Sequence, residues 1–496
     1  MKPFSDIVWM MRTAIFCLVV ILLVGYCLPA QEGHDCFTIV VGREASADGS
    51  VMVGHNEDDK GNFLVNVFKV PFQERRKNEL IILRNGGLLT QPPTTLGFLW
   101  LEIPDAEFGD AYFNERGLVI TSNSCPSRED RPDLTSGGIG FNLRRIVAER
   151  AHSAREAVKI AAGLIEQFGY SSSGRNYVFA DAEEGWFFHA VKGKHWVAQR
   201  VPDDRVAVMA NRYTIGIVDL ADKENFQGAA DIVSYAVTRG WHRTEHDNDF
   251  DFATSYADPV DWKSLGNILR QWRGINLLAK KHVAVDERFP FSFEPDRKIR
   301  PTDLFRVLRD HYEGTDYDLT RNYRNGSPNT TRNRTICTES TQFSFVTQLR
   351  SDLPPEIAYL AWIAFRRPDS NAYAPWYFLI TAPPSGYNRG SAEESLKNHF
   401  SPAGTRPDNP DEAFWSYAKL SELVDRQYNK RIEKAQKVWK NFENFAAKDL
   451  KNREKEFDFL LMSNRPLALK IITNYLHNLE YRRWFLASEL VKEFRK

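Results

Sequence analysis

Short apolar runs bounded by turn residues open the body of this chain and predict β-strands. The first run is Phe37–Gly42, FTIVVG, and the second is Val51–Asp58, VMVGHNED. The segment Ala47–Ser50 between them contains Asp-Gly, which is typical of a turn, so the pair predicts a β-hairpin. Its second strand would carry the polar group His55–Asp58 back towards the start of the first strand.

The hydrophobic period then lengthens to that of a helix. A strand is predicted at Gly117–Ser122, and Gly140–Phe168 follows with two apolar stripes at helical spacing. Ser153 and Glu156 form a predicted capping box that starts the second helix, and Gly169 is expected to end that helix. Four apolar segments come next and predict an antiparallel meander: NYVFADA, GWFFHAV, HWVAQRV and RVAVMANR.

Strands, then two helices, then more strands indicate an α+β sandwich in which helices cover sheets. Asp219–Thr320 mixes helical segments with polar loops, and Asn322–Arg334 is a polar connection. Another strand pair is predicted at TQFSFVTQL and IAYLAWIAF, and Asp411–Lys496 is charged and helical. We therefore expect a main domain over residues 36–400 and a helical C-terminal extension over 401–496.

The amino-terminal segment has the pattern of an export signal. Thr13–Tyr26 is apolar, follows Lys2 and Arg12, and is too short for a comfortable membrane span. With Ala30 as the small residue at the cleavage site, we expect a signal peptide over 1–30, a short propeptide over 31–35, and a secreted or periplasmic protein. An uncleaved signal anchor is the alternative, and a lipoprotein is disfavoured because Tyr26 precedes Cys27 where a small residue is wanted.

The composition of the chain limits which partners and cofactors are expected. The 496 residues include 65 basic and 65 acidic side chains, a formal net charge of +0 that gives no electrostatic argument for nucleic acid or an anionic membrane. Outside the leader the cysteines are Cys36, Cys125 and Cys337, an odd number that leaves one thiol unpaired in an exported protein. A Cys125–Cys337 disulfide is one arrangement. Without a CxxC or His-rich spacing, we expect no metal site and no cofactor.

Cys36 is the first candidate for chemistry, since it lies just beyond the leader. A cut between Asp35 and Cys36 would place a thiol and a free α-amine on the same residue. That amine has a reference pKa of about 8, so part of it is neutral at working pH and can accept the thiol proton. A nucleophile with an adjacent base is the basic unit of covalent catalysis. The competing interpretation is a buried structural cysteine.

Polar residues at strand ends supply further candidates. A carboxylate among His55–Asp58 can hold the α-ammonium of Cys36, and alternation puts Asn56 and Asp58 on the face opposite His55 and Glu57. Asn123 and Asn211 each follow an apolar strand, and an asparagine amide there can donate to a developing oxyanion. Arg334 and Arg350 are candidates for binding a carboxylate.

The segment CFTIVVGREASADGSVMVGHNEDD resembles the opening of the mature cysteine dipeptidases of the N-terminal-nucleophile hydrolase superfamily, the dipeptidase A type related to the secernins. The resemblance continues through FNERGLVITSNS, the predicted helix pair, the meander, VAVMANRYTIG and RTICTESTQFSFVTQLRSDLPPEIAYLAW. It covers roughly residues 36–387, with weaker likeness in the helical tail.

The resemblance implies a four-layer αββα sandwich, activated by exposing the cysteine as residue one, with additional C-terminal helices. Cys36 then resembles the nucleophile, Asp58 the acidic residue that contacts its α-amine, and Asn211 the oxyanion or substrate-positioning asparagine. Asn123 resembles a second donor, with a register offset of about one residue. His55 replaces the usual arginine, and Arg334 is the candidate for a second arginine.

The function expected from these residues is an exported cysteine dipeptidase that acts on dipeptides or short peptides without a metal. Two alternatives remain: an amidase for N-acyl compounds, like the bile-salt and penicillin V hydrolases, and a non-catalytic exported binding protein of the same fold. The sequence predicts no nucleic-acid partner and no membrane association beyond the leader. It leaves the preferred side chains and a homo-oligomer open.

Overall fold

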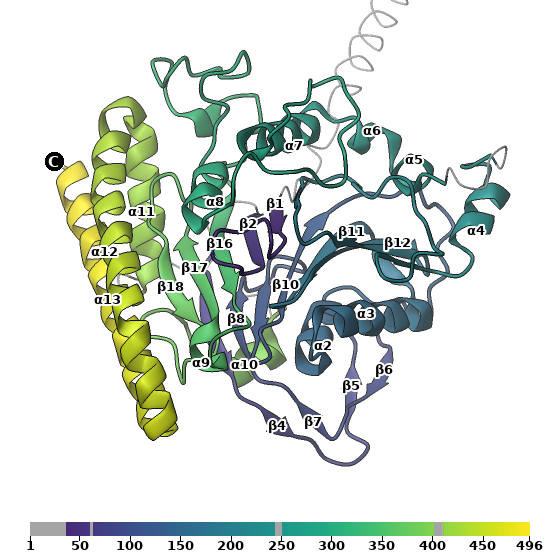
Figure 1. The fold of residues 1–496 in the computed structure, drawn as a ribbon, viewed down its shortest axis with the longest axis horizontal. Coiled ribbons are helices and arrows are strands. Elements are labelled where there is room, and N and C mark those ends of the chain that lie inside the picture. Colours follow the sequence, from purple (N-terminus) through teal and green to yellow (C-terminus); the bar gives the residue numbers. More distant parts are fainter. Residues whose placement is uncertain (1–35, 60–62, 244–249, 401–408, 410) are drawn as a thin grey trace, which may run out of the picture. The chain divides into compact units, whose positions relative to one another are not determined.

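The computed structural model describes residues 36–59, 63–243, 250–400, 409 and 411–496 (Figure 1). The predicted signal peptide and propeptide therefore lie outside the described residues. The described chain is a mixture of helices and antiparallel sheets, with two large sheets and two small two-stranded ribbons.

The first large sheet has six strands. Their order across the sheet is β14 (Val206–Met209), β1 (Phe37–Val41), β2 (Met52–Asp58), β16 (Thr341–Leu349), β17 (Tyr359–Phe365) and β18 (Ala374–Tyr377). The predicted pair β16 and β17 is confirmed, because the two strands run antiparallel with Phe345 opposite Ile363.

The second large sheet has eight strands. Their order is β15 (Phe226–Gly228), β13 (Trp196–Val201), β12 (Gly185–Gly193), β11 (Tyr170–Ala180), β10 (Val119–Ser124), β9 (Ala111–Asn114), β8 (Phe98–Glu102) and β3 (Asn66–Val70). The ribbons pair β4 (Gln73–Glu74) with β7 (Thr94–Thr95), and β5 (Leu80–Ile82) with β6 (Leu88–Thr90).

The predicted hairpin β1–β2 is confirmed, and its turn has a clear local cause. Asp48 accepts hydrogen bonds from the Ser50 backbone N–H at 3.2 Å and from the Ser50 hydroxyl at 2.6 Å. Gly49 has a φ of 78°, a conformation that glycine adopts at little cost. The register pairs Phe37 with Asn56 and Thr38 with His55, so the polar end of β2 returns beside Cys36.

The predicted four-stranded meander is wrong in its last strand. β11, β12 and β13 pair in sequence order, but β14 leaves this sheet and pairs antiparallel with β1 in the other one, with Met209 opposite Thr38. The segment Val206–Met209 is apolar and fully buried, so either sheet can accept it and only tertiary packing selects its partner. This exchange carries the residues after β14 to the edge where Cys36 lies.

The two sheets face one another through their apolar sides. Phe113 of β9 meets Phe345 of β16 edge to face, with 5.1 Å between ring centroids. Val40 of β1 packs on Gly185 of β12 so closely that an added β-carbon would lie 2.6 Å from its side chain. The inner face of the hairpin is therefore inside the protein, where polar groups need partners.

Helices cover the outer sides of both sheets (Figure 1). α2 (Asn142–Arg150) and α3 (Ala154–Phe168) pack on the eight-stranded sheet. Half of the predicted capping box is present, since Ser153 accepts from the Glu156 backbone N–H, while the Glu156 carboxylate accepts from the backbone N–H of His152. α7 (Leu265–Leu278) and α8 (Pro301–Leu308) pack on the six-stranded sheet. The shorter helices are α4 (Ile232–Thr238), α5 (Phe252–Tyr256), α6 (Pro259–Trp262), α9 (Pro355–Ala358), α10 (Ala392–Asn398) and the 3₁₀ helix η1 (Pro328–Thr330).

The C-terminal helices α11 (Ala413–Arg426), α12 (Tyr428–Ser463) and α13 (Arg465–Phe494) pack against β17 and β18. Their helical character agrees with the sequence prediction. Arg483 of α13 is buried and donates to the carbonyl oxygens of Ile363 and Ala372, so the last helix is bonded to the sheet itself. Trp439 of α12 donates to Ser370 O at 2.7 Å, which bonds this helix to the connection between β17 and β18.

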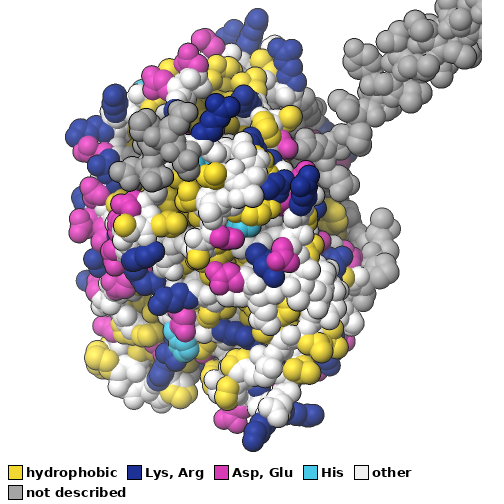
Figure 2. Space-filling model, turned by 90° about the vertical axis from the view of Figure 1, so that its right-hand side faces the viewer, with side chains coloured by type: hydrophobic (Ala, Val, Ile, Leu, Met, Phe, Trp, Pro, Cys, Tyr) yellow, Lys and Arg dark blue, Asp and Glu magenta, His cyan; other side chains and the backbone are white. Residues whose placement is uncertain are grey.

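The surface agrees with the balanced charge of the sequence. Basic and acidic side chains are interspersed over the face drawn in Figure 2. None of the helices among the described residues has the length and mean hydropathy needed to cross a bilayer.

Candidate active site

Cys36 lies immediately before β1 and is fully buried, with an exposed fraction of 0%. Because Phe37 pairs with Asn56, the next residue of β2, Glu57, lies beside Cys36. The Cys36 thiol donates to Oε1 of Glu57 at 3.1 Å. The hairpin thus brings a thiol and a carboxyl group into contact across a local turn.

Glu57 belongs to a series of hydrogen bonds between buried polar groups. Its Oε2 atom lies 3.0 Å from Nε2 of His55, and Nδ1 of His55 lies 2.8 Å from the Thr38 hydroxyl. Thr38 donates to Oδ1 of Asn123 at 2.7 Å, and Nδ2 of Asn123 donates to the carbonyl oxygen of Cys36 at 2.8 Å. This series of hydrogen bonds therefore begins at the Cys36 thiol and ends at the Cys36 carbonyl oxygen.

The positions of the protons follow from this closure. A carbonyl only accepts, so Asn123 must turn its amide nitrogen to Cys36 and its oxygen to Thr38. The Thr38 hydroxyl has one hydrogen, which it donates to Asn123. Its oxygen must therefore accept a hydrogen bond from Nδ1–H of His55. A neutral His55 then accepts at Nε2, which assigns the remaining hydrogen to Oε2 of Glu57. With a neutral His55, the network is satisfied only when Glu57 is protonated.

The electrostatic surroundings agree with this assignment. Burial raises the pKa of Glu57 to about 8, although the charge of Arg144 partly opposes the shift. Burial, together with the Arg144 charge, lowers the pKa of His55 to about 3. The His55–Glu57 contact falls within ion-pair distance, yet at neutral pH it is a hydrogen bond between uncharged groups. Burial also raises the pKa of the Cys36 thiol well above its usual value, and the Glu57 and Asp58 charges add to this shift.

A second group of polar side chains surrounds the Cys36 carbonyl. Arg270 of α7 donates to Cys36 O at 3.3 Å from Nη1 and to Asn211 Oδ1 at 3.0 Å from Nη2. Asn211 donates to Ser124 O at 2.9 Å. Asn267, one turn earlier on α7, accepts from Arg270 at 2.6 Å and donates to Asn211 O at 3.1 Å. The sequence-predicted Asn211 is therefore joined to Cys36 through an arginine.

Asp58 lies at the end of β2 and is fully buried. Its Oδ1 atom accepts from the Thr341 hydroxyl at 2.6 Å, and its backbone N–H donates to the Cys36 sulfur. Its carboxylate is close enough to raise the pKa of the Cys36 thiol. The predicted neighbourhood of Asp58 and Cys36 is thus present.

Two predicted candidates lie elsewhere. Asn56 points to the other face of β2, as alternation requires, and donates to Leu308 O and Ile336 O, both at 2.9 Å. Through its bond to Leu308 O, Asn56 links the end of α8 to β2. Arg334 donates to the Ser340 hydroxyl at 3.2 Å, and its β-carbon lies beside Gly266 in the first turn of α7.

Three members of the site escaped the sequence prediction: Thr38, Glu57 as a candidate in its own right, and Arg270. The period of two already places Glu57 on the face of His55, so that signal was available. Arg270 lies within the amphipathic helix LGNILRQWRGINLL, where its neighbourhood depends entirely on how α7 packs.

The cysteines are all free and buried among the described residues, so the Cys125–Cys337 disulfide does not form. Two groups of described residues have donor atoms within 4.8 Å of one another and the ligand types that metals take. One is Cys36, His55 and Glu57 in this site, and the other is His311, Cys337 and Asp369.

Comparisons with known proteins bear on the chemistry of this site. The model of Peptidase family C69 matches residues 35–441, a segment that begins one residue before Cys36. A probable dipeptidase of Latilactobacillus sakei is 25% identical over 457 residues, covering 88% of this chain and 92% of the relative. Dipeptidase A of Lactobacillus helveticus is 24% identical over 459 residues, covering 89% and 94%.

Among solved structures, the chain is similar to penicillin V acylase from Agrobacterium tumefaciens. The TM-score is 0.36 and the sequences are 14% identical, over 68% of this chain and 84% of that chain.

Proposed function

This chain belongs to peptidase family C69, and on that premise we propose that it is an exported cysteine dipeptidase in which Cys36 is the nucleophile. The observation that carries the proposal is that several polar groups contact one cysteine. Glu57, Asp58 and the Asn123 and Arg270 side chains all contact Cys36, and the family match begins at the preceding residue. Relatives that cover most of this chain are named dipeptidases, which supports dipeptides as the substrate class.

The proposed enzyme needs Cys36 at its amino terminus. In the full chain the Cys36 nitrogen forms a peptide bond with Asp35, and an amide nitrogen cannot act as a base. Cleavage of that bond would create an α-amine on the nucleophile itself. The amine, held by Asp58, accepts the thiol proton as the sulfur attacks the scissile carbonyl, and it returns the proton to the leaving amine. Water then hydrolyses the acyl-enzyme.

The oxyanion of this reaction needs preorganised donors. Asn211 is the proposed donor, and Arg270 is proposed to orient it, since the guanidinium binds Asn211 Oδ1 and the Cys36 carbonyl together. Asn123 directs its amide nitrogen to Cys36 O, which supports a role in positioning the nucleophile.

Glu57 and His55 are proposed to keep the precursor inactive. A protonated Glu57 and a raised thiol pKa leave Cys36 uncharged while its nitrogen is blocked. Release of the α-ammonium adds a positive charge beside both groups, which lowers the pKa of the thiol and of Glu57. The same cut would then supply the base and favour the thiolate.

The proposal includes a finer description of fold and location. Helices on the outer sides of two facing sheets support a four-layer αββα sandwich of the N-terminal-nucleophile type. Export rests on the apolar leader Thr13–Tyr26 and the small residue Ala30.

The test compares two forms of the protein, one beginning at Cys36 and one beginning at Gln31, on a panel of dipeptides and N-acyl amino acids. We expect the first form to hydrolyse dipeptides and the second to do so only after it is cut at Cys36, as followed by intact mass. Cys36→Ala should abolish turnover, whereas Cys125→Ala, at a buried thiol outside the site, should keep it. Dipeptide hydrolysis by the Cys36→Ala variant would refute the mechanism.

A further inference from the structure

A second cluster of ligand-type side chains lies outside the candidate active site. His311 follows α8, Cys337 precedes β16, and Asp369 lies between β17 and β18. All three are buried, and their donor atoms lie within 4.8 Å of one another. We propose that His311, Cys337 and Asp369 bind a zinc ion that has a structural role, independent of the peptidase chemistry.

The donor set fits zinc better than it fits other common cations. Zinc binds thiolate, imidazole and carboxylate together, whereas calcium and magnesium take oxygen ligands. Three protein ligands leave one position of a tetrahedral ion for water.

His311 is oriented as metal-binding histidines are. Its Nδ1 atom lies 3.2 Å from Oε1 of Glu313, which also accepts from the Tyr323 hydroxyl. Its Nε2 atom has no hydrogen bond and lies 3.6 Å from Oδ2 of Asp369. A carboxylate that holds one ring nitrogen and leaves the other facing the ion is the usual second-shell arrangement.

Asp369 and Cys337 complete the site. Oδ2 of Asp369 accepts from the Tyr428 hydroxyl at 2.9 Å, while Oδ1 has no hydrogen bond although it is buried. The backbone N–H of Asp369 donates to the Cys337 sulfur, a bond that favours a thiolate. Burial raises the pKa of the Cys337 thiol well above its usual value, and a bound cation would offset that cost by replacing the proton.

One neighbouring cation works against metal binding. Nε of Arg367 lies 3.8 Å from Oδ1 of Asp369. Arg367 is itself paired with Asp425 at 2.5 Å, so its charge is largely compensated. With Cys337 ionised, the thiolate, Asp369 and Glu313 leave enough negative charge around His311 for a divalent ion.

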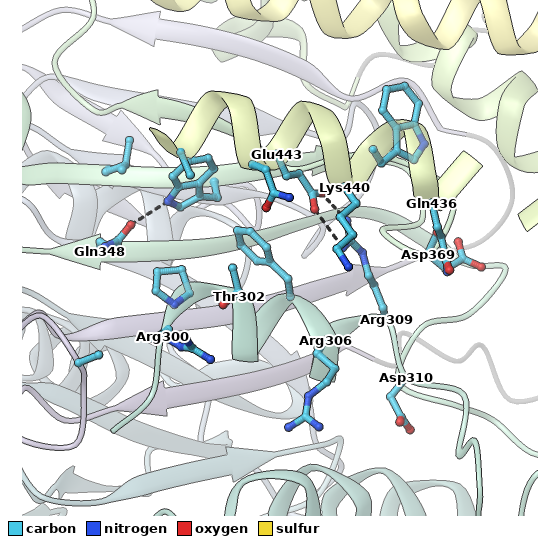
Figure 3. Close-up of a pocket in the computed structure, with 18 of the residues that line it drawn as sticks. Arg300, Thr302, Arg306, Arg309, Asp310, Gln348, Asp369, Gln436, Lys440 and Glu443 are labelled. Carbon is cyan, nitrogen blue, oxygen red and sulfur yellow. Dashed lines mark hydrogen bonds and ion pairs between the residues drawn. The ribbon is translucent and has the colours of Figure 1, made fainter. Parts of the chain in front are cut away.

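One ligand of the proposed site borders a large cavity. Asp369 and Glu313 line a cavity of about 1190 Å³ between α8, α12 and the outer face of β16 and β17. Figure 3 shows Asp369 at one end of this cavity, close to Gln436 of α12. Because Tyr428 of α12 bonds Asp369, an ion here would link three separate segments to the C-terminal helices.

The test is the metal content of the full chain after dialysis against metal-free buffer, measured by plasma mass spectrometry. We expect about one zinc ion per chain, lost in Cys337→Ser and His311→Gln. Cys125→Ser is the matched control at another buried thiol and should keep the ion. Cys36→Ser should keep it too, which separates this site from the Cys36–His55–Glu57 group.

Cobalt provides a second readout, which reports a metal–thiolate bond directly. In the Cys36→Ser protein, Cys337 is the ligand-type cysteine that remains, so bound Co²⁺ should show the near-ultraviolet absorption of a cobalt–thiolate bond. Zinc that persists in Cys337→Ser but disappears in Cys36→Ser would overturn the assignment. So would a folded protein that takes up neither ion. Each result is read from metal content, so it stands whether or not the protein hydrolyses dipeptides.

Discussion

Nε2 of His55 lies 3.0 Å from Oε2 of Glu57, and burial lowers the pKa of the imidazole to about 3 and raises the pKa of the carboxyl group to about 8. The arrangement inverts the usual ion pair of histidine and glutamate. It exists because both side chains are buried on the inner face of β2, where the charged form of each is poorly solvated. The Cys36 thiol, Thr38 and Asn123 extend this pair into a closed series of hydrogen bonds that begins and ends at Cys36.

Glu57→Gln tests the protonated state of Glu57. The folded-state pKa of about 8 lies above the unfolded value of 4.5, so the stabilising contribution is present below pH 4.5 and is lost as the pH rises through 8. Glutamine imitates the protonated group and cannot ionise. Between these pH values we expect the variant to gain stability over the parent by at most about 1.4 kcal/mol per pH unit in urea unfolding. Parallel pH profiles would show that Glu57 is ionised in the folded protein.

His55→Gln tests the neutral histidine. The folded-state pKa of about 3 lies below the unfolded value of 6.5, so stability is lost as the pH falls from 6.5 towards 3. At pH 7 the variant should be less stable by about 1–3 kcal/mol, because it interrupts the series of hydrogen bonds. As the pH falls below 6.5, its stability should decrease less steeply than that of the parent. His152→Gln, at an exposed histidine, is the control and should retain the parent's acid limb.

Thr38→Val removes the hydroxyl that joins His55 to Asn123 and keeps the shape of the side chain. Two buried polar groups lose their partner, so we expect a loss of about 2–4 kcal/mol in the free energy of unfolding. Thr38→Ser keeps the hydroxyl and removes one methyl group, at a cost of about 1 kcal/mol. Equal losses in the two variants would mean that packing, and not the hydrogen bonds, stabilises this position.

Arg270→Lys keeps the charge on α7 but cannot bind Asn211 and the Cys36 carbonyl at once. If Arg270 orients the oxyanion donor, kcat of dipeptide hydrolysis should fall about 100-fold with little change in KM. Arg273→Lys, one turn along the same helix and paired with Asp310, is the control and should keep kcat. An unchanged kcat in Arg270→Lys would assign this arginine to stability alone.

Asp58→Asn tests the carboxylate proposed to hold the α-amine of the mature enzyme. Removing the negative charge should lower the pKa of that amine, so the acidic limb of kcat/KM should move to lower pH by about one unit. Glu183→Gln, at an exposed carboxylate, should leave the limb in place. A limb that does not move would mean that Asp58 does not contact the base.

The local parts of this structure could be predicted because their causes are local. The β1–β2 hairpin follows from an Asp-Gly turn and two short apolar runs, and the start of α3 follows from Ser153 and Glu156. Once the hairpin exists, the period of two decides that His55 and Glu57 face one way and Asn56 the other. Cys36 and its first neighbours could therefore be predicted from the sequence.

The remaining site depends on contacts between distant segments. β14 is apolar throughout, so its pattern suits either sheet, and only packing placed it beside β1 and Asn211 beside Arg270. His311, Cys337 and Asp369 share no spacing motif, and they meet because the segment from α8 to β16, which holds His311 and Cys337, packs beside the β17–β18 connection, which holds Asp369. By itself the sequence determined the β1–β2 hairpin, the β16–β17 pair and the cap of α3, and it singled out Cys36, since turns, strand alternation and capping act over a few residues. Only the tertiary structure decided which side chains surround that thiol and which form the proposed zinc site, since those contacts join residues tens to hundreds of positions apart.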